Sequence, residues 1–186
     1  MKNKRKLIII TGPSGVGKGT VVKEILEKNN NFWLSISATT REPRIGERDG
    51  QEYYFLTKQK FREMISGGLF LEWAEFAGNL YGTLEESVTQ KINSGSIVIL
   101  EIEVEGARQV REKYPHTLSI FLLPPSKKEL EKRIRKRATD KEDSILRRLK
   151  RAEFEIDSSK DFDFAVTNQN LDETVEEILE LIKVFN

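Results

Sequence analysis

The 186-residue sequence contains no cysteine and only one histidine. The absence of cysteine excludes disulfide bonds, thiolate metal sites and a cysteine nucleophile, and it is compatible with a reducing compartment. Long apolar runs are also missing. The run Leu7–Ile10 is too short for a secretion signal, and no stretch approaches the roughly 20 apolar residues that span a membrane. We therefore expect a cytoplasmic globular protein with one domain, long enough to bury a proper core.

The net charge is small but unevenly distributed. It is +1 overall, which argues against a nucleic-acid polymer or a membrane surface as partner. Residues 126–151 carry 12 Lys and Arg against 5 Asp and Glu, a net charge of +7, while the rest of the chain carries −6. A basic segment in an otherwise acidic chain indicates an anionic ligand. The alternative is a solvated helical face with internal ion pairs. The oligomeric state stays open.

Strand-like apolar runs alternate with helix-like stretches along the chain. The alternation predicts an α/β fold, with a mainly parallel sheet flanked by helices and ligands bound beyond the carboxyl ends of the strands. A small, mostly β insertion over 35–83 and a short basic one near 137–143 interrupt it. The expected strands are 7–10, 96–100, 118–123 and 162–166, and the expected helices are 18–29, 57–66, 104–113, 126–137, 143–157 and a last one from 171.

Residues 12–20, Gly-Pro-Ser-Gly-Val-Gly-Lys-Gly-Thr, join the first strand to a helix, as a phosphate-binding loop (P-loop) does. The glycines allow backbone N–H groups to converge on phosphate oxygens at the positive end of the helix. Lys18 supplies a charge for the outer phosphates. Gly19 stands where a Ser or Thr usually holds magnesium, so Thr20 is the candidate hydroxyl, directly or through water. The alternative is an ordinary glycine-rich turn.

Two segments of the β insertion suggest a nucleotide. Arg41 and Arg44, among the hydroxyls of 35–44, can grip a phosphate because a guanidinium donates a planar fork of N–H groups. A solvated turn is the alternative. Glu72 lies among aromatic residues, and its carboxylate can accept the two N–H donors that guanine offers and adenine lacks. The alternative is an amphipathic strand whose Glu72 faces water.

Two further sets of candidate functional residues are charged: acidic residues at the end of a buried strand and arginines around residue 140. Glu101 and Glu103 end a buried strand, where they could hold magnesium through water or touch a nucleobase. For the neighbouring Glu105 we prefer a simple stabilising charge at a helix N-terminus. Arginines around residue 140 could belong to a closing lid and stabilise the charge of a transferring phosphoryl group. The alternative is a basic helical face.

Taken together, these motifs resemble the guanylate kinases, the ATP-dependent GMP kinases of the nucleoside monophosphate kinase group. The resemblance runs from Ile8 to the last helix, and five motifs occur in family order. The segments Ser-x-Ser-x-Thr-Thr-Arg-x-Pro-Arg (35–44) and Gly-Asn-x-Tyr-Gly (78–82) are distinctive. The resemblance implies a single domain over 1–186. It would comprise a P-loop kinase core (1–34, 84–136 and 158–186), a GMP-binding insertion (about 35–83) and a lid (about 137–157).

The resemblance also implies roles for individual residues. ATP would contact Gly12, Ser14, Gly15, Val16, Gly17, Lys18, Gly19, Thr20, Arg133 and Asn168. The GMP phosphate would be held by Ser37, Arg41, Arg44, Tyr53 and Tyr81, and guanine by Glu72, Thr83 and Glu103. Lys18, Arg44, Arg137 and Arg148 would act on the transferring group, with Mg²⁺ near Thr20 and Glu101. Glu103 is one methylene longer than the aspartate common in the family, and Ala138 replaces a common lid glycine.

The implied activity is reversible transfer of the γ-phosphoryl group of ATP to GMP, and also to dGMP, without a covalent enzyme intermediate. A guanylate-kinase-like binding module that holds peptides is the main alternative, although such domains typically lack an intact P-loop. A kinase for another monophosphate and a P-loop GTPase are the others. Glu72 with the 35–44 segment argues against the first, and two separate phosphate-gripping segments argue against the second.

Overall fold

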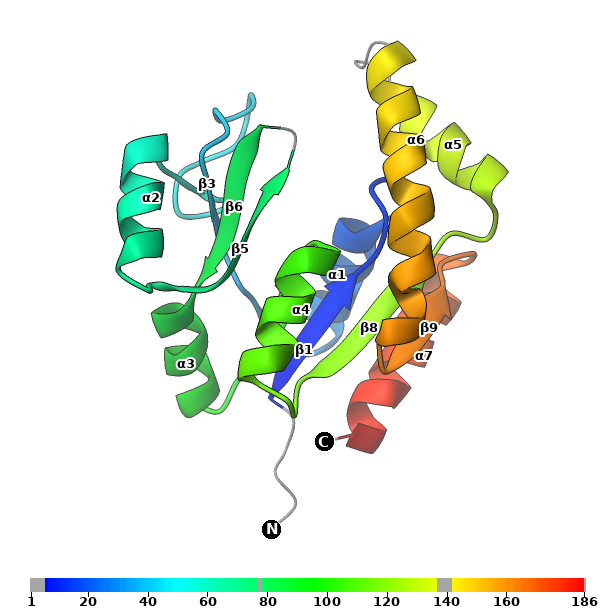
Figure 1. The fold of residues 1–186 in the computed structure, drawn as a ribbon. Helices are drawn as coiled ribbons and strands as arrows, with labels where there is room; N and C mark the ends of the chain where they lie inside the picture. The colour runs from blue at the N-terminus through cyan, green and yellow to red at the C-terminus, as the bar shows by residue number, and fades with distance from the viewer. Residues whose placement is uncertain (1–5, 77, 137–141, 186) are drawn as a thin grey trace.

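A five-stranded parallel sheet forms the centre of the computed structural model, which describes residues 6–76, 78–136 and 142–185 (Figure 1). Its strand order is β2-β7-β1-β8-β9, and every pairing in it is parallel. The strands are β1 (Leu7–Thr11), β2 (Phe32–Leu34), β7 (Ile97–Glu101), β8 (Leu118–Leu123) and β9 (Phe164–Thr167). This arrangement confirms the predicted α/β fold with a mainly parallel sheet.

Helices cover both faces of this sheet, which explains why its strands are almost uniformly apolar. Ile8 and Ile10 of β1 face α1 and α7, whereas Leu7 and Ile9 face α3 and α4, because successive side chains of a strand alternate between its faces. The helices are α1 (Lys18–Lys28), α3 (Glu85–Asn93), α4 (Val104–Lys113), α5 (Lys127–Lys136), α6 (Glu142–Asp157) and α7 (Leu171–Phe185), with a 3-10 turn η1 (Ser158–Asp161) after α6.

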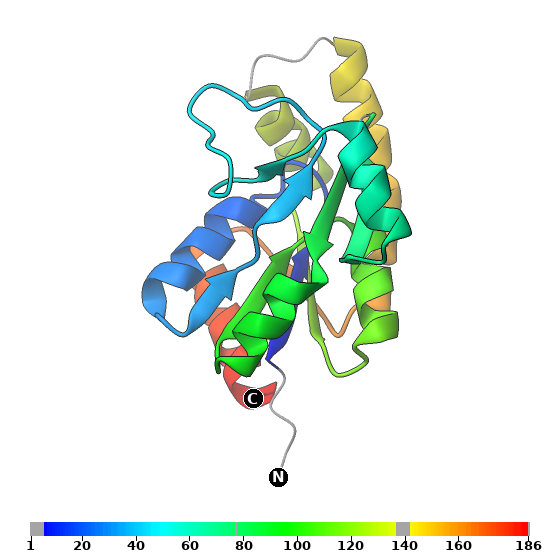
Figure 2. The same cartoon turned by 90° about the vertical axis from the view of Figure 1, so that its left-hand side faces the viewer.

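A second, smaller sheet stands beside the first and faces the viewer in Figure 2. Its order is β4-β3-β6-β5, and β5 therefore forms one edge. Helix α2 (Lys58–Ser66) packs on it through Phe61, whose ring stacks on Phe70 at 4.4 Å. The strands are β3 (Ser37–Thr39), β4 (Tyr54–Phe55), β5 (Phe70–Phe76) and β6 (Asn79–Leu84). The predicted β insertion with its helix is thus confirmed.

Some elements differ from the prediction. Strand β2 and helix α3 were not predicted, and β2 has only three half-buried residues, too few to establish a period. The last strand begins at Phe164 rather than at residue 162, because Phe162 follows the 3-10 turn and packs its ring edge-on against Phe121 at 5.3 Å. Arg137 and Ala138 lie outside the described residues. Over the described ranges, no helix is long and apolar enough to cross a membrane.

Candidate active site

The P-loop follows β1 directly and ends at α1. Gly12 has φ +149°, and a Cβ atom there would lie 2.5 Å from the carbonyl oxygen of Leu122 in the neighbouring strand. Gly17 caps α1 in the left-handed region, and a Cβ atom there would lie 2.7 Å from the amide nitrogen of Asn168. The loop can therefore hold this shape only with glycine at these positions. The glycines at these two positions are therefore a requirement of the fold around the loop.

Side chains from distant parts of the chain fix the P-loop. The Asn168 Nδ2 group donates to the Val16 carbonyl oxygen at 2.8 Å, and one Arg133 nitrogen donates to the same oxygen at 3.1 Å. A second Arg133 nitrogen donates to the Asn168 carbonyl oxygen at 3.3 Å. From α6, Arg148 donates to Ser14 Oγ at 2.9 Å. Three residues predicted to contact ATP or its phosphate thus converge on the loop itself.

Lys18 extends from the start of α1 towards the end of β7. Its Nζ donates to the Gly12 carbonyl oxygen at 2.6 Å and lies 3.9 Å from Glu103 Oε1. Only 11% of the Lys18 side chain is exposed, and Glu103 Oε2 is buried without a hydrogen-bond partner in the part of the chain that the structure describes. The ammonium group is therefore held at the loop by one carbonyl and one carboxylate.

Gly19 lies beside Glu101 at ordinary van der Waals distance. A Cβ atom there would lie 3.6 and 3.7 Å from the two carboxylate oxygens of Glu101, at the end of β7. Thr20, next along the helix, is exposed. Within the described ranges no group of three or more acidic or histidine side chains could hold a metal ion alone. A cation here would need phosphate oxygens and water as its other ligands, as Mg²⁺ commonly does.

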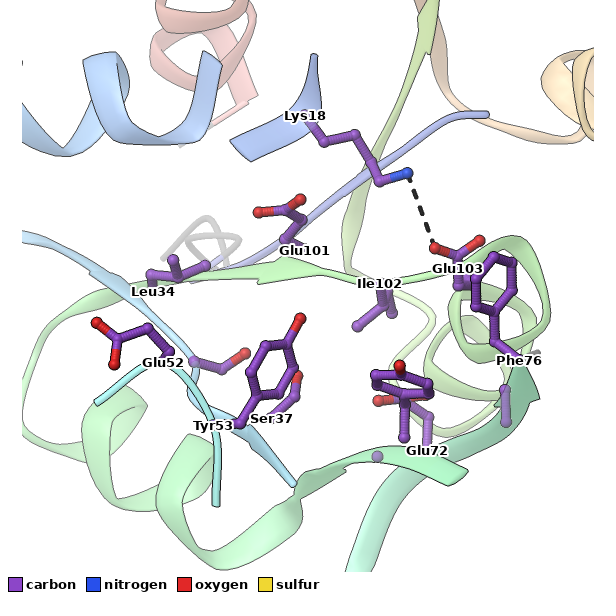
Figure 3. A pocket seen from close by; sticks show the side chains of 14 residues that line it. Lys18, Leu34, Ser37, Glu52, Tyr53, Glu72, Phe76, Glu101, Ile102 and Glu103 are labelled. Carbon is purple, nitrogen blue, oxygen red and sulfur yellow. Dashed lines mark ion pairs between the residues drawn. The ribbon is translucent and has the colours of Figure 1, made fainter. Parts of the chain in front are cut away.

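A cavity of about 230 Å³ separates the P-loop from the small sheet. Figure 3 shows Lys18, Glu101 and Glu103 on one side of it, with Tyr53, Ser37 and Glu72 on the other. The lining includes every predicted GMP contact except Arg41, Arg44 and Thr83. It consists of Lys18, Leu34, Ser35, Ser37, Glu52, Tyr53, Glu72, Ala74, Phe76, Tyr81, Gly82, Glu101, Ile102 and Glu103.

Glu72 is buried, with 4% of its surface exposed, so the alternative of a water-facing strand residue is wrong. A shift of register in β5 between Phe70 and Glu72 breaks the strand's alternation, as a β-bulge does, and leaves Phe70, Leu71 and Glu72 all buried. The Thr83 hydroxyl donates to Glu72 Oε1 at 2.6 Å. Burial raises the pKa of Glu72 to about 7, against the opposing effect of the Thr83 hydrogen bonds.

The loop after β3 carries the two predicted phosphate-binding arginines. Arg41 pairs with Glu47 at 2.9 Å, and its guanidinium lies 5.4 Å from the centre of the Tyr53 ring. The other Glu47 oxygen accepts from the Arg44 backbone N–H at 2.7 Å, so Glu47 organises the turn between the two arginines. Burial raises the pKa of Tyr53, whose hydroxyl therefore stays protonated and able to donate. The Tyr81 ring stands edge-on to that of Tyr53, 6.1 Å away.

Comparison with known proteins agrees with this geometry. The family model for guanylate kinase matches residues 4–184. The chain belongs to the guanylate kinase family. A guanylate kinase of Prochlorococcus marinus (strain MIT 9312) is 64% identical over 183 residues, which cover 98% of this chain and 100% of that protein. A guanylate kinase of Trichormus variabilis is 52% identical over 173 residues, which cover 93% of this chain and 87% of that protein.

Solved structures agree in fold. The crystal structure of guanylate kinase from Anaplasma phagocytophilum has a TM-score of 0.79 and 32% identity, and the match covers 96% of this chain and 84% of that one. A shikimate kinase from Bacteroides thetaiotaomicron, 17% identical with a TM-score of 0.51, shares the fold alone. As a guanylate kinase, the protein is an enzyme that transfers a phosphoryl group from ATP to GMP. The alternatives of a binding module, another monophosphate kinase and a GTPase are thereby set aside.

Beside this guanylate kinase site lie Arg151 and Glu155, which the motifs did not predict. Arg151 of α6 places its guanidinium 4.4 Å from the centre of the Phe76 ring in β5, and its Nε donates to Glu155 Oε1 at 2.8 Å. Glu155 is 7% exposed, and burial raises its pKa. The helix after the basic segment therefore contacts the small sheet directly. The four-residue spacing of Arg151 and Glu155 was the available signal.

Proposed function

We infer that GMP occupies the cavity with guanine at Glu72 and its phosphate among the arginines and tyrosines of the small sheet. The observation that carries this is the pairing of one buried carboxylate with one phosphate-binding loop across a single cavity. Guanine N1–H and N2–H are donors that the Glu72 carboxylate can accept, with Thr83 fixing its orientation. Ser37, Arg41, Arg44, Tyr53 and Tyr81 would hold the phosphate, and Glu103 would assist at the base.

ATP would bind with its phosphates in the P-loop, over Gly12, Ser14, Gly15, Val16, Gly17, Lys18, Gly19 and Thr20. Lys18 lies within this loop and Arg148 contacts it, which supports a role for both cations in stabilising the negative charge that would develop during transfer. The attacking group is a phosphate oxygen of GMP, so no general base is needed and positioning carries the reaction. Arg133 and Asn168 would support the loop at the nucleotide, and Arg137 would act from the lid.

Mg²⁺ fits beside the P-loop because the two Glu101 oxygens lie over Gly19, at the edge of the sheet where the phosphates would bind. Bound there, it would neutralise phosphate charge during the transfer. Glu101 and Thr20 would hold it, directly or through water. The division into a core, a GMP-binding insertion of about 35–83 and a lid of about 137–157 follows from the same proposal, and we propose a cytoplasmic location.

The proposal is tested by measuring ADP release from Mg-ATP with GMP, dGMP, AMP and CMP offered separately. We expect turnover with GMP and dGMP, which carry the same base and phosphate. With AMP we expect kcat/KM to be lower by about 10⁴-fold, because adenine lacks the two N–H donors that guanine would offer to the buried Glu72 carboxylate. Comparable turnover with AMP would contradict the guanine-reading role of Glu72, while leaving the kinase activity intact.

The same role makes GMP recognition pH-dependent. The pKa of Glu72 is about 7, and only its ionised form can accept both guanine donors. We therefore expect kcat/KM for GMP to fall towards tenfold per pH unit as the pH drops below 7, since this ratio reports ionisations of the free enzyme and free substrate. A steady-state series from pH 5.5 to 8.5 measures it.

The GMP phosphate also titrates near pH 6, so the series needs a reference. Glu72→Gln supplies it, because this variant keeps only the dependence that comes from the phosphate and from other groups. The difference between the two profiles then isolates the carboxyl group. Superimposable profiles for wild type and Glu72→Gln would contradict the prediction.

A further inference from the structure

Helix α4 runs along the open edge of the small sheet. Strand β5 forms that edge, and among the described residues no further strand pairs with its outward N–H and C=O groups. Side chains of α4 take the place of that strand. The Trp73 N–H donates to Gln109 Oε1 at 3.1 Å, and Gln109 Nε2 donates back to the Trp73 carbonyl oxygen at 2.8 Å. One turn later, Lys113 Nζ donates to the Phe70 carbonyl oxygen at 3.0 Å.

Gly106 lies one turn before Gln109, on the same face of α4, and opposite Glu72. Its backbone is helical and has no positive φ, so nothing in the local conformation requires glycine. Alanine is the better helix former at such a position. The requirement comes from across the interface, because a Cβ atom on Gly106 would overlap Glu72 Oε2 and lie 2.9 Å from the carboxyl carbon.

We propose that Gly106 determines base specificity because its lack of a side chain leaves room for the Glu72 carboxyl group. This space beside Gly106 is called the slot below. The proposal rests on the guanine-reading role inferred above for Glu72. Gln109 fixes the position of β5 against α4 through its two hydrogen bonds to the backbone of Trp73, the residue after Glu72. The Thr83 hydroxyl holds the other oxygen of the Glu72 carboxyl group, which is therefore held from both sides. The carboxylate also lies beside the first turn of α4, where the partial charge of the helix is positive. Gly106 touches no nucleotide in this scheme and acts through Glu72, as a positioning residue.

The test is Gly106→Ala, with Gly67→Ala as its matched control. Gly67 has φ −78°, and a Cβ atom there meets nothing closer than 3.5 Å. In Gly106→Ala the Glu72 carboxyl group must shift, and we expect this shift to disturb its hydrogen bond with Thr83. We expect KM for GMP to rise at least tenfold and the preference for GMP over AMP to narrow, with KM for ATP within twofold of wild type. Gly67→Ala should match wild type in all three. A Gly106→Ala enzyme with wild-type KM for GMP would overturn the proposal.

A second pair of variants separates positioning from a general loss of structure. In a Glu72→Ala background the slot is empty, so adding Gly106→Ala should change KM for GMP by less than twofold and should not lower the melting temperature. This pair also serves if Gly106→Ala alone fails to fold. An equal loss in both backgrounds would mean that Gly106 acts on something other than Glu72, and would overturn the proposal.

Glu72→Gln, assayed in parallel, distinguishes the two levels of the argument. If Glu72→Gln loses base discrimination while Gly106→Ala retains it, the slot hypothesis fails and the guanine-reading role stands. If Glu72→Gln keeps wild-type discrimination, the guanine-reading role fails and the slot hypothesis fails with it. Loss of discrimination in both, together with the silent effect in the Glu72→Ala background, supports both.

Discussion

Replacing Lys18 with methionine is expected to lower kcat by about a thousandfold while the protein still folds. Methionine keeps most of the stem and removes the charge, so the loss isolates the ammonium group. That group lies in the P-loop, fixed by the Gly12 carbonyl and 3.9 Å from Glu103. A preorganised cation aimed at developing charge in a water-poor site typically contributes two to three orders of magnitude. Steady-state measurements with saturating ATP and GMP give kcat directly.

Lys23→Met is the control for this substitution. Lys23 lies on the same helix, its side chain is 74% exposed, and its only ion pair given by the structure is an exposed one with Glu27 at 3.8 Å. We expect it to retain wild-type kcat. Circular dichroism of both variants shows whether the fold is intact. Turnover in Lys18→Met within threefold of wild type would refute the role of the P-loop lysine.

Glu72→Gln is expected to make the protein more stable above pH 7 while weakening GMP recognition. The pKa of Glu72 is about 7 in the folded protein, against a usual value of 4.5, so the folded state binds this proton more tightly than the unfolded state does. Stability is therefore lost as the pH rises from 4.5 to about 7, by about 3 kcal/mol at most. Glutamine removes this charge, but its buried amide needs a new acceptor, which costs roughly 1 kcal/mol. The expected net gain at pH 8 is about 2 kcal/mol.

Urea unfolding at pH 5 and pH 8 measures this effect. The gain should be large at pH 8 and nearly absent at pH 5, because the wild-type carboxyl group is mostly protonated at the lower pH. Glu75→Gln, on an exposed position of the same strand, should leave stability within about 0.5 kcal/mol at both values. Equal stability of wild type and Glu72→Gln at pH 8 would show that burial does not penalise this carboxylate. A gain here would mean that the enzyme retains a destabilising group for the sake of recognition.

The sequence alone was sufficient for β1, β7, β8 and β9 of the main sheet because these strands are short apolar runs, whereas the three half-buried residues of β2 gave no such signal. It was sufficient for the P-loop because glycine spacing there reflects backbone geometry. It was not sufficient for Glu72, whose burial depends on a change of register inside β5 that strand alternation does not anticipate. Gly106 and Gln109 contact Glu72 and Trp73, which lie more than 30 residues earlier in the sequence, in β5 of the small sheet. Their roles depend on how α4 docks, which no local pattern encodes.

The attachment of the P-loop to distant side chains also bears on how the enzyme is made. The Val16 carbonyl receives Arg133 from 117 residues further along the chain and Asn168 from 152 residues further along. A ribosome synthesises the glycine-rich motif well before the two residues whose side chains shape it. Contacts of such long sequence separation form slowly, because a large loop must close before they stabilise anything. A nascent chain halted before α5 would thus carry the nucleotide-binding motif without either anchor, and one halted before β9 would still lack Asn168.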